Sequence, residues 1–270
     1  MAAATILIDR IGFAYTARSP RVLDDVSLTI APGAITALVG RSGSGKSSLL
    51  HIIAGLAKPS AGQIVIDGVA VDGPTPRAVM MFQSPSLYPW LTVAENVAIG
   101  LRFAGLKHPD IARRVADTLA LVGLEGAARS RATSISGGQA QRAALARALV
   151  MQPDVLLLDE PFAALDLFTR LDLQRDIRAI AKRFNITVVL VSHDIPEIAR
   201  MADRAAFLAG SPARIVTETA ISEAARCDDD EASRAEIARL TALYEQVSGA
   251  ATPQRAPIVH TAAATPAFAQ

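Results

Sequence analysis

The stretch Ala37–Leu50, "ALVGRSGSGKSSLL", sets an apolar run, a glycine-rich turn, a Lys-Ser pair and two leucines in direct succession. It matches the pattern G-x-x-x-x-G-K-[ST], whose fixed positions are here Gly40, Gly45, Lys46 and Ser47. The apolar run predicts the end of a buried strand, and the residues after the turn predict the start of a helix. The sequence therefore predicts a strand–loop–helix unit that binds the phosphates of a nucleoside triphosphate.

The residue types in this loop suit phosphate chemistry. Glycines let the backbone curl so that several N–H groups point at one anion, and the following helix offers its positive end. Lys46 adds a mobile positive charge for the outer phosphates, and Ser47 adds an oxygen ligand for Mg²⁺. We expect ATP and Mg²⁺ as ligands, with ATP contacts from Gly40, Arg41, Ser42, Gly43, Ser44, Gly45, Lys46, Ser47 and Ser48.

Short apolar segments alternate with helical patterns along the chain, which predicts an α/β fold of the P-loop NTPase class with a mostly parallel sheet. The first strands, punctuated by Gly and Pro, are expected to form an antiparallel flank. The predicted strands are Ile6–Asp9, Val26–Ile30, Ala34–Val39, Gln63–Asp67, Val79–Phe82, Val155–Leu158, Thr187–Val191, Ala205–Leu208 and Arg214–Val216.

The pattern changes to helix between about residues 84 and 136, which predicts an α-helical subdomain inserted in the sheet domain. Thr92-x-x-Glu95 is a capping box that predicts the start of its first helix. We expect an ATP-binding domain over residues 1–217 and a helical extension over 218–248. Residues 249–270 are rich in Ala, Pro and Thr, and their composition predicts a flexible tail.

Composition limits the partners of the chain. Its 270 residues carry a net charge of +1 without any basic block, so we expect no nucleic-acid partner. The apolar N-terminal run is cut by Asp9 and lacks a basic segment before it, which argues against a secretory signal. No apolar run reaches the roughly 18 residues that cross a bilayer, so any membrane role is expected to come through a partner.

A second group of residues follows the apolar run "VLLL", residues 155–158. Asp159 and Glu160 lie at the carboxyl end of this predicted strand, and in an open parallel sheet that end faces the ligand crevice. Asp159 is expected to hold Mg²⁺ together with Ser47, and Glu160 to orient or deprotonate an attacking water.

A third group is "SGGQ", Ser136, Gly137, Gly138 and Gln139. Ser136 and Gln139 form a second capping box, which predicts a helix through Leu149. Because glycine costs about 1 kcal/mol relative to alanine in a helix, a glycine pair suggests that something approaches the backbone closely. We predict a second anion site here, which two copies placed head to tail could close on one nucleotide.

In their order along the chain, these motifs resemble those of ABC transporter ATP-binding subunits, over roughly residues 6–216. The phosphate loop resembles the Walker A motif, "VLLLDE" resembles Walker B, and "ISGGQ" resembles the signature LSGGQ with Ile135 in place of leucine. Three further motifs are "MFQS", "AALD" and "VSHD", which supply Gln83, Asp166 and His193. Ala163 stands where the family often has serine.

The resemblance implies a homodimer that holds each ATP between the Walker A loop of one copy and the signature of the other. It implies that Glu160 is the catalytic carboxylate, that His193 hydrogen-bonds the γ-phosphate, and that Gln83 contacts Mg²⁺ or the attacking water. The same resemblance implies that Asp166 is one of the ATP-binding residues. Tyr15 matches the family's adenine-stacking aromatic, although it fits equally a strand residue that packs on the flank.

Among ABC proteins, the chain is most similar to the ATPases of nitrate, sulfonate and taurine importers. This type implies two transmembrane permease subunits, a periplasmic or extracellular solute-binding protein, and a peripheral position on the cytoplasmic face of the inner membrane. The alternatives are the ATPase of a lipid-extraction machine and a soluble ABC ATPase that acts on ribosomes or DNA. Trp90 lies in a Pro-flanked loop where it either docks a partner or plugs the helical insert.

Overall fold

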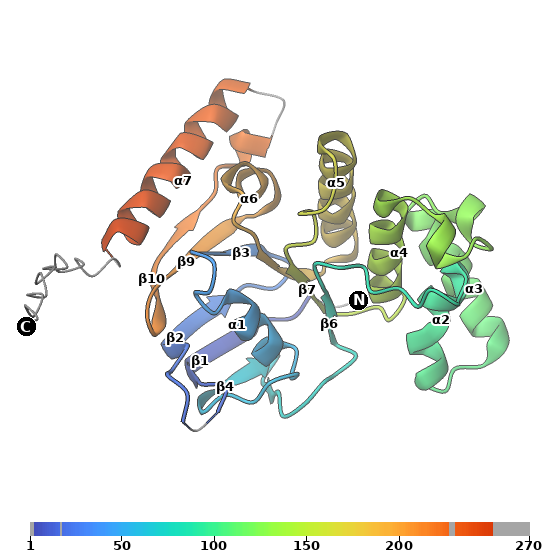
Figure 1. The fold of residues 1–270 in the computed structure, drawn as a ribbon, viewed down its shortest axis with the longest axis horizontal. Coiled ribbons are helices and arrows are strands. Elements are labelled where there is room, and N and C mark those ends of the chain that lie inside the picture. Colours follow the sequence, from blue (N-terminus) through green and yellow to red (C-terminus); the bar gives the residue numbers. More distant parts are fainter. Residues whose placement is uncertain (1–2, 17, 227–229, 251–270) are drawn as a thin grey trace, which may run out of the picture.

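The computed structural model describes residues 3–16, 18–226 and 230–250, and within them one ten-stranded sheet runs through the molecule (Figure 1). The order of its strands is β5-β4-β1-β2-β10-β9-β3-β8-β7-β6. Helices cover both faces of this sheet, as the sequence predicts. The predicted α/β class, with a mostly parallel core, an antiparallel flank and a helical insert, is confirmed.

Five neighbouring strands form the parallel core of the sheet. They are β6 (Ala78–Met81), β7 (Val155–Asp159), β8 (Thr187–Val191), β3 (Ile35–Val39) and β9 (Arg204–Gly210). Every residue of β3 and β8 is buried, which explains why both read as continuous apolar runs rather than as alternating ones. Their carboxyl ends lie at one edge of the sheet, so the loops that follow them converge.

The antiparallel flank consists of β1 (Ile6–Phe13), β2 (Leu23–Ile30), β4 (Ala61–Ile66) and β5 (Val69–Ala70). It joins the core through β10 (Ala213–Ala220), which pairs antiparallel with β9 and meets β2 at the single register pair Ala213 and Leu23. Strand β1 runs four residues beyond the predicted Asp9, because bulges around the left-handed Arg10 (φ 49°) let pairing continue to Phe13.

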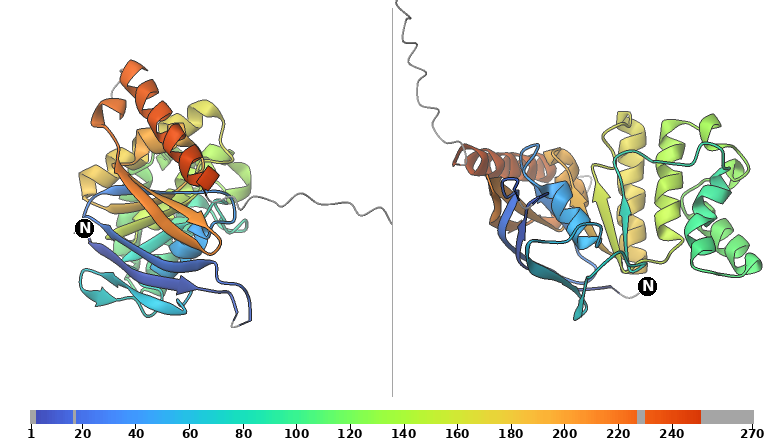
Figure 2. Two further views of the ribbon diagram at one scale, coloured as in Figure 1. Left: turned by 90° about the vertical axis from the view of Figure 1, so that its left-hand side faces the viewer. Right: turned by 60° about the horizontal axis from the view of Figure 1, so that its bottom comes forward.

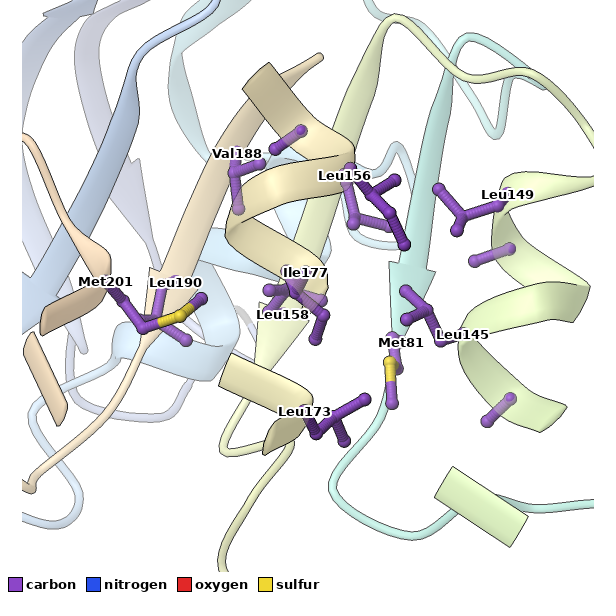
Figure 3. Packing of buried hydrophobic residues seen from close by; sticks show 14 of the residues in the cluster. Met81, Leu145, Leu149, Leu156, Leu158, Leu173, Ile177, Val188, Leu190 and Met201 are labelled. Carbon is purple, nitrogen blue, oxygen red and sulfur yellow. The ribbon is translucent and has the colours of Figure 1, made fainter. Parts of the chain in front are cut away.

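Two apolar cores lie on the two faces of the parallel strands. One face packs against α1 (Lys46–Ile53) and the flank strands. The other packs against α5 (Leu167–Phe184) and α6 (Ile195–Met201), with Leu173 and Ile177 of α5 over Leu156, Leu158, Val188 and Leu190 of the strands (Figure 3). Successive side chains of each strand point to opposite faces of the sheet, and both faces are apolar. The helices α1 and α5 can therefore pack on opposite sides of the sheet.

The helical insert forms a separate lobe beside β6 (Figure 1). It contains α2 (Val93–Phe103), α3 (His108–Leu121) and α4 (Gly137–Leu149), with short 3₁₀ turns at Glu125–Ala127 and Ala132–Ser134. Both predicted capping boxes are confirmed, since Thr92 caps α2 and Ser136 caps α4 through reciprocal hydrogen bonds.

The prediction of helix from Glu218 onward is wrong at its start. Strand β10 continues to Ala220 and pairs Glu218 with Ala206 of β9, because side chains in "ARIVTETA" alternate between the two faces of the sheet. A 3₁₀ turn at Glu223–Arg226 and α7 (Asp230–Ala250) follow. Leu240 of α7 is fully buried in the core that also contains α6.

The predicted flexible tail lies outside the described residues from position 251 onward. In the part of the chain that the structure describes, none of the helices has the length and apolar character needed to cross a membrane.

Candidate functional site

The glycine-rich loop joins the end of β3 to the start of α1. Gly45 has φ 84°, and a Cβ atom there would lie 2.7 Å from Cδ2 of Leu23, so both its backbone and its packing require glycine. Gly43 has φ 79°, and a Cβ atom there would meet nothing within 4 Å. The loop is therefore held on its inner side by the fold and open on its outer side.

The Lys46 side chain closes over this loop. Its Nζ donates hydrogen bonds of 2.9 Å to the carbonyl oxygens of Gly40 and Arg41, and the residue is 6% exposed. Burial lowers the pKa of Lys46, while the charges of Glu160 and Asp159 oppose that shift. A buried ammonium group bonded to neutral carbonyls has donor capacity for an anion, which fits a phosphate at this loop.

Ser47 and Asp159 meet where the start of α1 lies beside the end of β7. The Ser47 Oγ donates to Oδ1 of Asp159 at 2.9 Å, and burial raises the pKa of Asp159 against the effect of that hydrogen bond. No group of three or more His, Cys, Asp or Glu side chains that could hold a metal occurs in the described residues. Two oxygen ligands fit Mg²⁺, because this ion usually completes its shell with water and nucleotide phosphates.

Glu160 directly follows β7 in a strained backbone conformation, with φ 45°. Its N–H donates to the carbonyl oxygen of Val191 at 3.0 Å, which ties it to the end of β8. One carboxylate oxygen lies 3.2 Å from Nδ1 of His193, whose side chain is 67% exposed. The turn after β7 and the turn after β8 therefore bring the two predicted catalytic side chains together at the edge that also carries Asp159.

Gln83 and Tyr15 lie at the margins of this site. Gln83 comes two residues after the end of β6, and its side chain is exposed. Tyr15 is 70% exposed, and its hydroxyl group lies 2.7 Å from Oγ of Ser48 in the first turn of α1. The Tyr15 ring also packs edge-on against Phe13, so it combines an exposed ring with a contact to the flank.

The signature residues lie elsewhere in the chain, at the start of α4. A Cβ atom on Gly138 would lie 2.5 Å from Cγ2 of Thr169, whereas one on Gly137 would meet nothing within 4 Å. Gly138 therefore lets α4 approach α5, and Gly137 leaves the helix start open. Asp166 caps α5 by accepting from the N–H of Thr169, and its hydrogen bonds with Thr169 lower its pKa.

The structure thus brings the predicted residues into two groups rather than one. The first group surrounds the phosphate loop, and the second, Ser136–Gln139 with Asp166, lies at the starts of α4 and α5. Helix α5 lies between α1, which follows the phosphate loop, and α4, which begins at Gly137, in Figure 1 and in the right-hand view of Figure 2.

Two residues that the sequence analysis missed hold the loop after Gln83. Arg147 of α4 donates to the carbonyl oxygens of Pro85 and Ser86 at 2.7 and 2.8 Å, and Asn96, fully buried in α2, bonds the backbone of Tyr88 in both directions. Their partners are main-chain atoms of a loop, which no sequence pattern reveals.

The same loop exposes 66% of Trp90, with its ring centroid 5.5 Å from that of Tyr88. The structure therefore contradicts the suggestion that Trp90 plugs the helical insert, because most of the side chain faces outward.

Comparison with known proteins identifies the family. A family model described as "ABC transporter" matches residues 23–163. The chain is 42% identical over 227 residues to the aliphatic sulfonates import ATP-binding protein SsuB 2 of Burkholderia lata, covering 84% of this chain and 82% of that protein. It is also 42% identical over 232 residues to the taurine import ATP-binding protein TauB of Pseudomonas fluorescens, covering 86% and 88%.

Solved structures agree with this result. The dimeric ATP-binding cassette MJ0796 in a post-hydrolysis state, bound to ADP and Pi, superposes with a TM-score of 0.70 at 29% identity, covering 80% of this chain and 99% of that one. CbiO1 of Clostridium perfringens, part of the ABC transporter complex cbiONQ, gives 0.75 at 26% identity, covering 89% and 97%. The chain is an ATPase cassette and belongs to the ABC transporter ATP-binding family.

Proposed function

We propose that this chain is the ATP-hydrolysing subunit of an importer for organosulfonates, such as taurine or aliphatic sulfonates. The family assignment supports the ATPase, and the sulfonate and taurine import functions named for the two similar relatives support the substrate class. The observation that carries the chemistry is the convergence of Lys46, the Ser47–Asp159 pair and the Glu160–His193 pair at one edge of the sheet.

Each of these groups has a task in phosphoryl transfer. Lys46 leaves the carbonyls of the loop to bind the outer phosphates, and the N–H groups of the loop surround the same anion. Ser47 and Asp159 would hold Mg²⁺. The ion would supply positive charge that offsets the negative charge developing on the phosphate oxygens. Gln83, two residues after the end of β6, would contact the ion or the water.

Glu160 orients the attacking water and accepts its proton. Nδ1 of His193 lies 3.2 Å from the Glu160 carboxylate, and its other ring nitrogen would hydrogen-bond a γ-phosphate. The strained backbone of Glu160, anchored to Val191, limits the positions that its carboxylate can reach. Tyr15 stacks on the adenine ring in this proposal.

The separation of the two groups of site residues supports a head-to-tail homodimer. Ser136, Gly137 and Gln139 begin α4 rather than the helix that follows the phosphate loop, and a Cβ atom on Gly137 would meet nothing within 4 Å, so they would bind the ATP held by a second copy. The dimeric state of MJ0796 is consistent with this arrangement. ATP would then close the dimer because it contacts both copies, and hydrolysis would release it.

We further propose that the homodimer binds two transmembrane permease subunits at the cytoplasmic face of the inner membrane, with a periplasmic or extracellular solute-binding protein on the other side. The exposed Tyr88–Trp90 loop is the proposed contact for a permease, because it carries clustered aromatic side chains on a backbone that Asn96 and Arg147 hold in place.

The test is reconstitution with the co-purified permease and solute-binding protein, followed by measurement of ATP hydrolysis with taurine, alkanesulfonates and nitrate. Stimulation by a sulfonate, absent in the E160Q variant, supports the proposal. Stimulation by nitrate alone would overturn the substrate class, and lipid-dependent hydrolysis without any solute-binding protein would support a lipid-extraction machine instead.

A further inference from the structure

Three polar contacts join α5 to α6 and its cap; Arg178 of α5 donates to the carbonyl oxygen of Met201 at the end of α6, and the other two lie one helical turn apart nearer the site. In the first of these two, Nη1 of Arg170 on α5 lies 3.4 Å from Oδ2 of Asp194, the residue that caps α6 and directly follows His193. The same guanidinium group donates to the carbonyl oxygen of Leu165 at 3.0 Å, next to Asp166. Arg170 therefore links the turn that contains Asp166 with the turn that contains His193.

The second contact lies deeper between the two helices. Nε2 of Gln174 on α5 donates to Oε2 of Glu197 on α6 at 3.4 Å, and the two residues are 3% and 5% exposed. Oε1 of Gln174 is buried and has no hydrogen-bond partner among the described residues. An ionised carboxylate can only accept hydrogen bonds, so it satisfies the amide NH₂ of Gln174 and leaves the amide oxygen without a donor.

A protonated Glu197 has the hydrogen-bond donor that this amide oxygen lacks. A carboxylic acid donates one hydrogen bond and accepts another, so it matches the acceptor and donor of a carboxamide in a paired arrangement. Burial raises the pKa of Glu197 to about 7, and the negative charges of Asp194 and Glu160 act in the same direction, against the hydrogen bond from Ser192 and the charge of Arg170.

The other elements that pack on α6 are α7 and the 3₁₀ turn before it, and their buried charged groups are engaged elsewhere. Glu236 of α7 pairs with Arg239 at 2.6 Å, and Arg226 of the turn lies 3.5 Å from Asp203. Besides burial, the pKa of Glu197 is therefore set by the hydrogen bond from Ser192 and by the charges of Asp194, Arg170 and Glu160.

We infer that Glu197 and Gln174 form a carboxylic acid–carboxamide pair which, together with the Arg170–Asp194 ion pair, positions His193 relative to Asp166. Glu197 is a positioning residue in this arrangement, since its side-chain partners are Gln174 and Ser192 rather than residues of the phosphate loop. The inference rests on the proposed ATPase site, because its consequence is the placement of the His193 ring against Glu160.

The pair couples two parts of the proposed cycle. Asp166 lies in the second group of site residues, which would face a partner copy, whereas His193 lies at the phosphate loop. In this proposal the polar contacts between α5 and α6 couple the positions of the two helices, so closure on a partner at Asp166 would be transmitted to His193. Loss of the Glu197 proton places a third carboxylate near Asp194 and Glu160 and opposes the amide oxygen of Gln174, which loosens this link.

The test compares ATP hydrolysis by the full chain and by E197Q, E197A and E236Q between roughly pH 6 and 9, with kcat and KM measured separately. E197Q keeps a neutral partner for Gln174 at every pH. We expect kcat of the parent, relative to E197Q, to fall about three- to tenfold with a midpoint near pH 7, at unchanged KM. E236Q is the matched control, because Glu236 is also buried but has a lowered pKa, and its profile should follow the parent.

E197A should lose activity throughout, and E197Q should restore it at low pH. Parallel pH profiles for the parent and E197Q would overturn the inference, and so would full activity of E197A. A pH-difference infrared spectrum gives a second measurement that needs no turnover: the protonated carboxyl signal should be present in the parent near pH 6 and absent in E197Q. An inactive parent that shows this signal would refute the proposed function but not the protonated pair.

Discussion

The raised pKa of Glu197 predicts how the stability of the folded chain depends on pH. The folded protein binds this proton more tightly than the unfolded chain does, because the pKa is about 7 when buried and 4.5 ordinarily. The contribution of Glu197 to the free energy of unfolding is therefore fully present below about pH 4.5 and is lost as the pH rises through 7. Since one pKa unit equals about 1.4 kcal/mol, the full effect is roughly 3 kcal/mol.

Most of that change, about 2.5 kcal/mol, should occur between roughly pH 5 and 8. The assay is urea unfolding followed by far-UV circular dichroism, without nucleotide, for the parent and E197Q across that range. We expect the free energy of unfolding of the parent to fall relative to that of E197Q as the pH rises. All other titrating groups are common to both proteins, so the difference between the two curves isolates position 197.

E236Q serves as the control, because the stability that Glu236 contributes should depend on pH in the opposite direction. The Glu236 pKa is lowered, first by its hydrogen bond with Arg239, so its contribution is present above its ordinary pKa and lost in acid rather than near pH 7. A difference between the parent and E197Q that stays constant from pH 5 to 8 would refute the idea that Glu197 is protonated in the folded chain.

Three further substitutions test the site and its surroundings. E160Q should bind ATP but hydrolyse it at least about a hundredfold more slowly, and should run as a dimer on a sizing column with ATP; turnover at the parental rate would remove Glu160 as the base. G138A should be about 1–3 kcal/mol less stable than G137A in urea unfolding, because its Cβ meets Thr169 while that of G137A enters open space; equal stabilities would contradict the close packing of α4 on α5. W90A should bind ATP normally but assemble poorly with the permease in co-purification, and normal assembly would show that the exposed ring is not part of the docking surface.

Much of the fold follows from short-range patterns. The phosphate loop, the capping boxes at Thr92 and Ser136 and the buried strands β7 and β8 depend on neighbours along the chain, so the sequence alone predicts them. Strand β10 was predicted too short, since its last residues are fixed by pairing with β9 rather than by their own apolar content.

In the site, too, some features follow from neighbours along the chain and others depend on contacts with distant segments. The residue types of Lys46 and Asp159 indicate phosphate and Mg²⁺ chemistry from their positions after two strands. The left-handed backbone of Glu160, by contrast, depends on its hydrogen bond to Val191 of another strand. The Gln174–Glu197 contact joins two helices through side chains 23 positions apart, and no pattern along the chain marks such a pair.

Through Arg147, α4 connects the signature residues at its start to the loop that carries Trp90, so it can act as a lever arm. The first turn of this helix carries Ser136 and Gly137, and a point about eleven residues further along holds the loop of Trp90 through the carbonyl oxygens that Arg147 binds. A helix rises about 1.5 Å per residue, so the arm is roughly 16 Å long, and tilting it by about 10° displaces its far end by about 3 Å. In the proposed importer, a permease that pushed on the aromatic loop would swing the start of α4 toward or away from the nucleotide of the partner copy, with no rearrangement inside the helix itself.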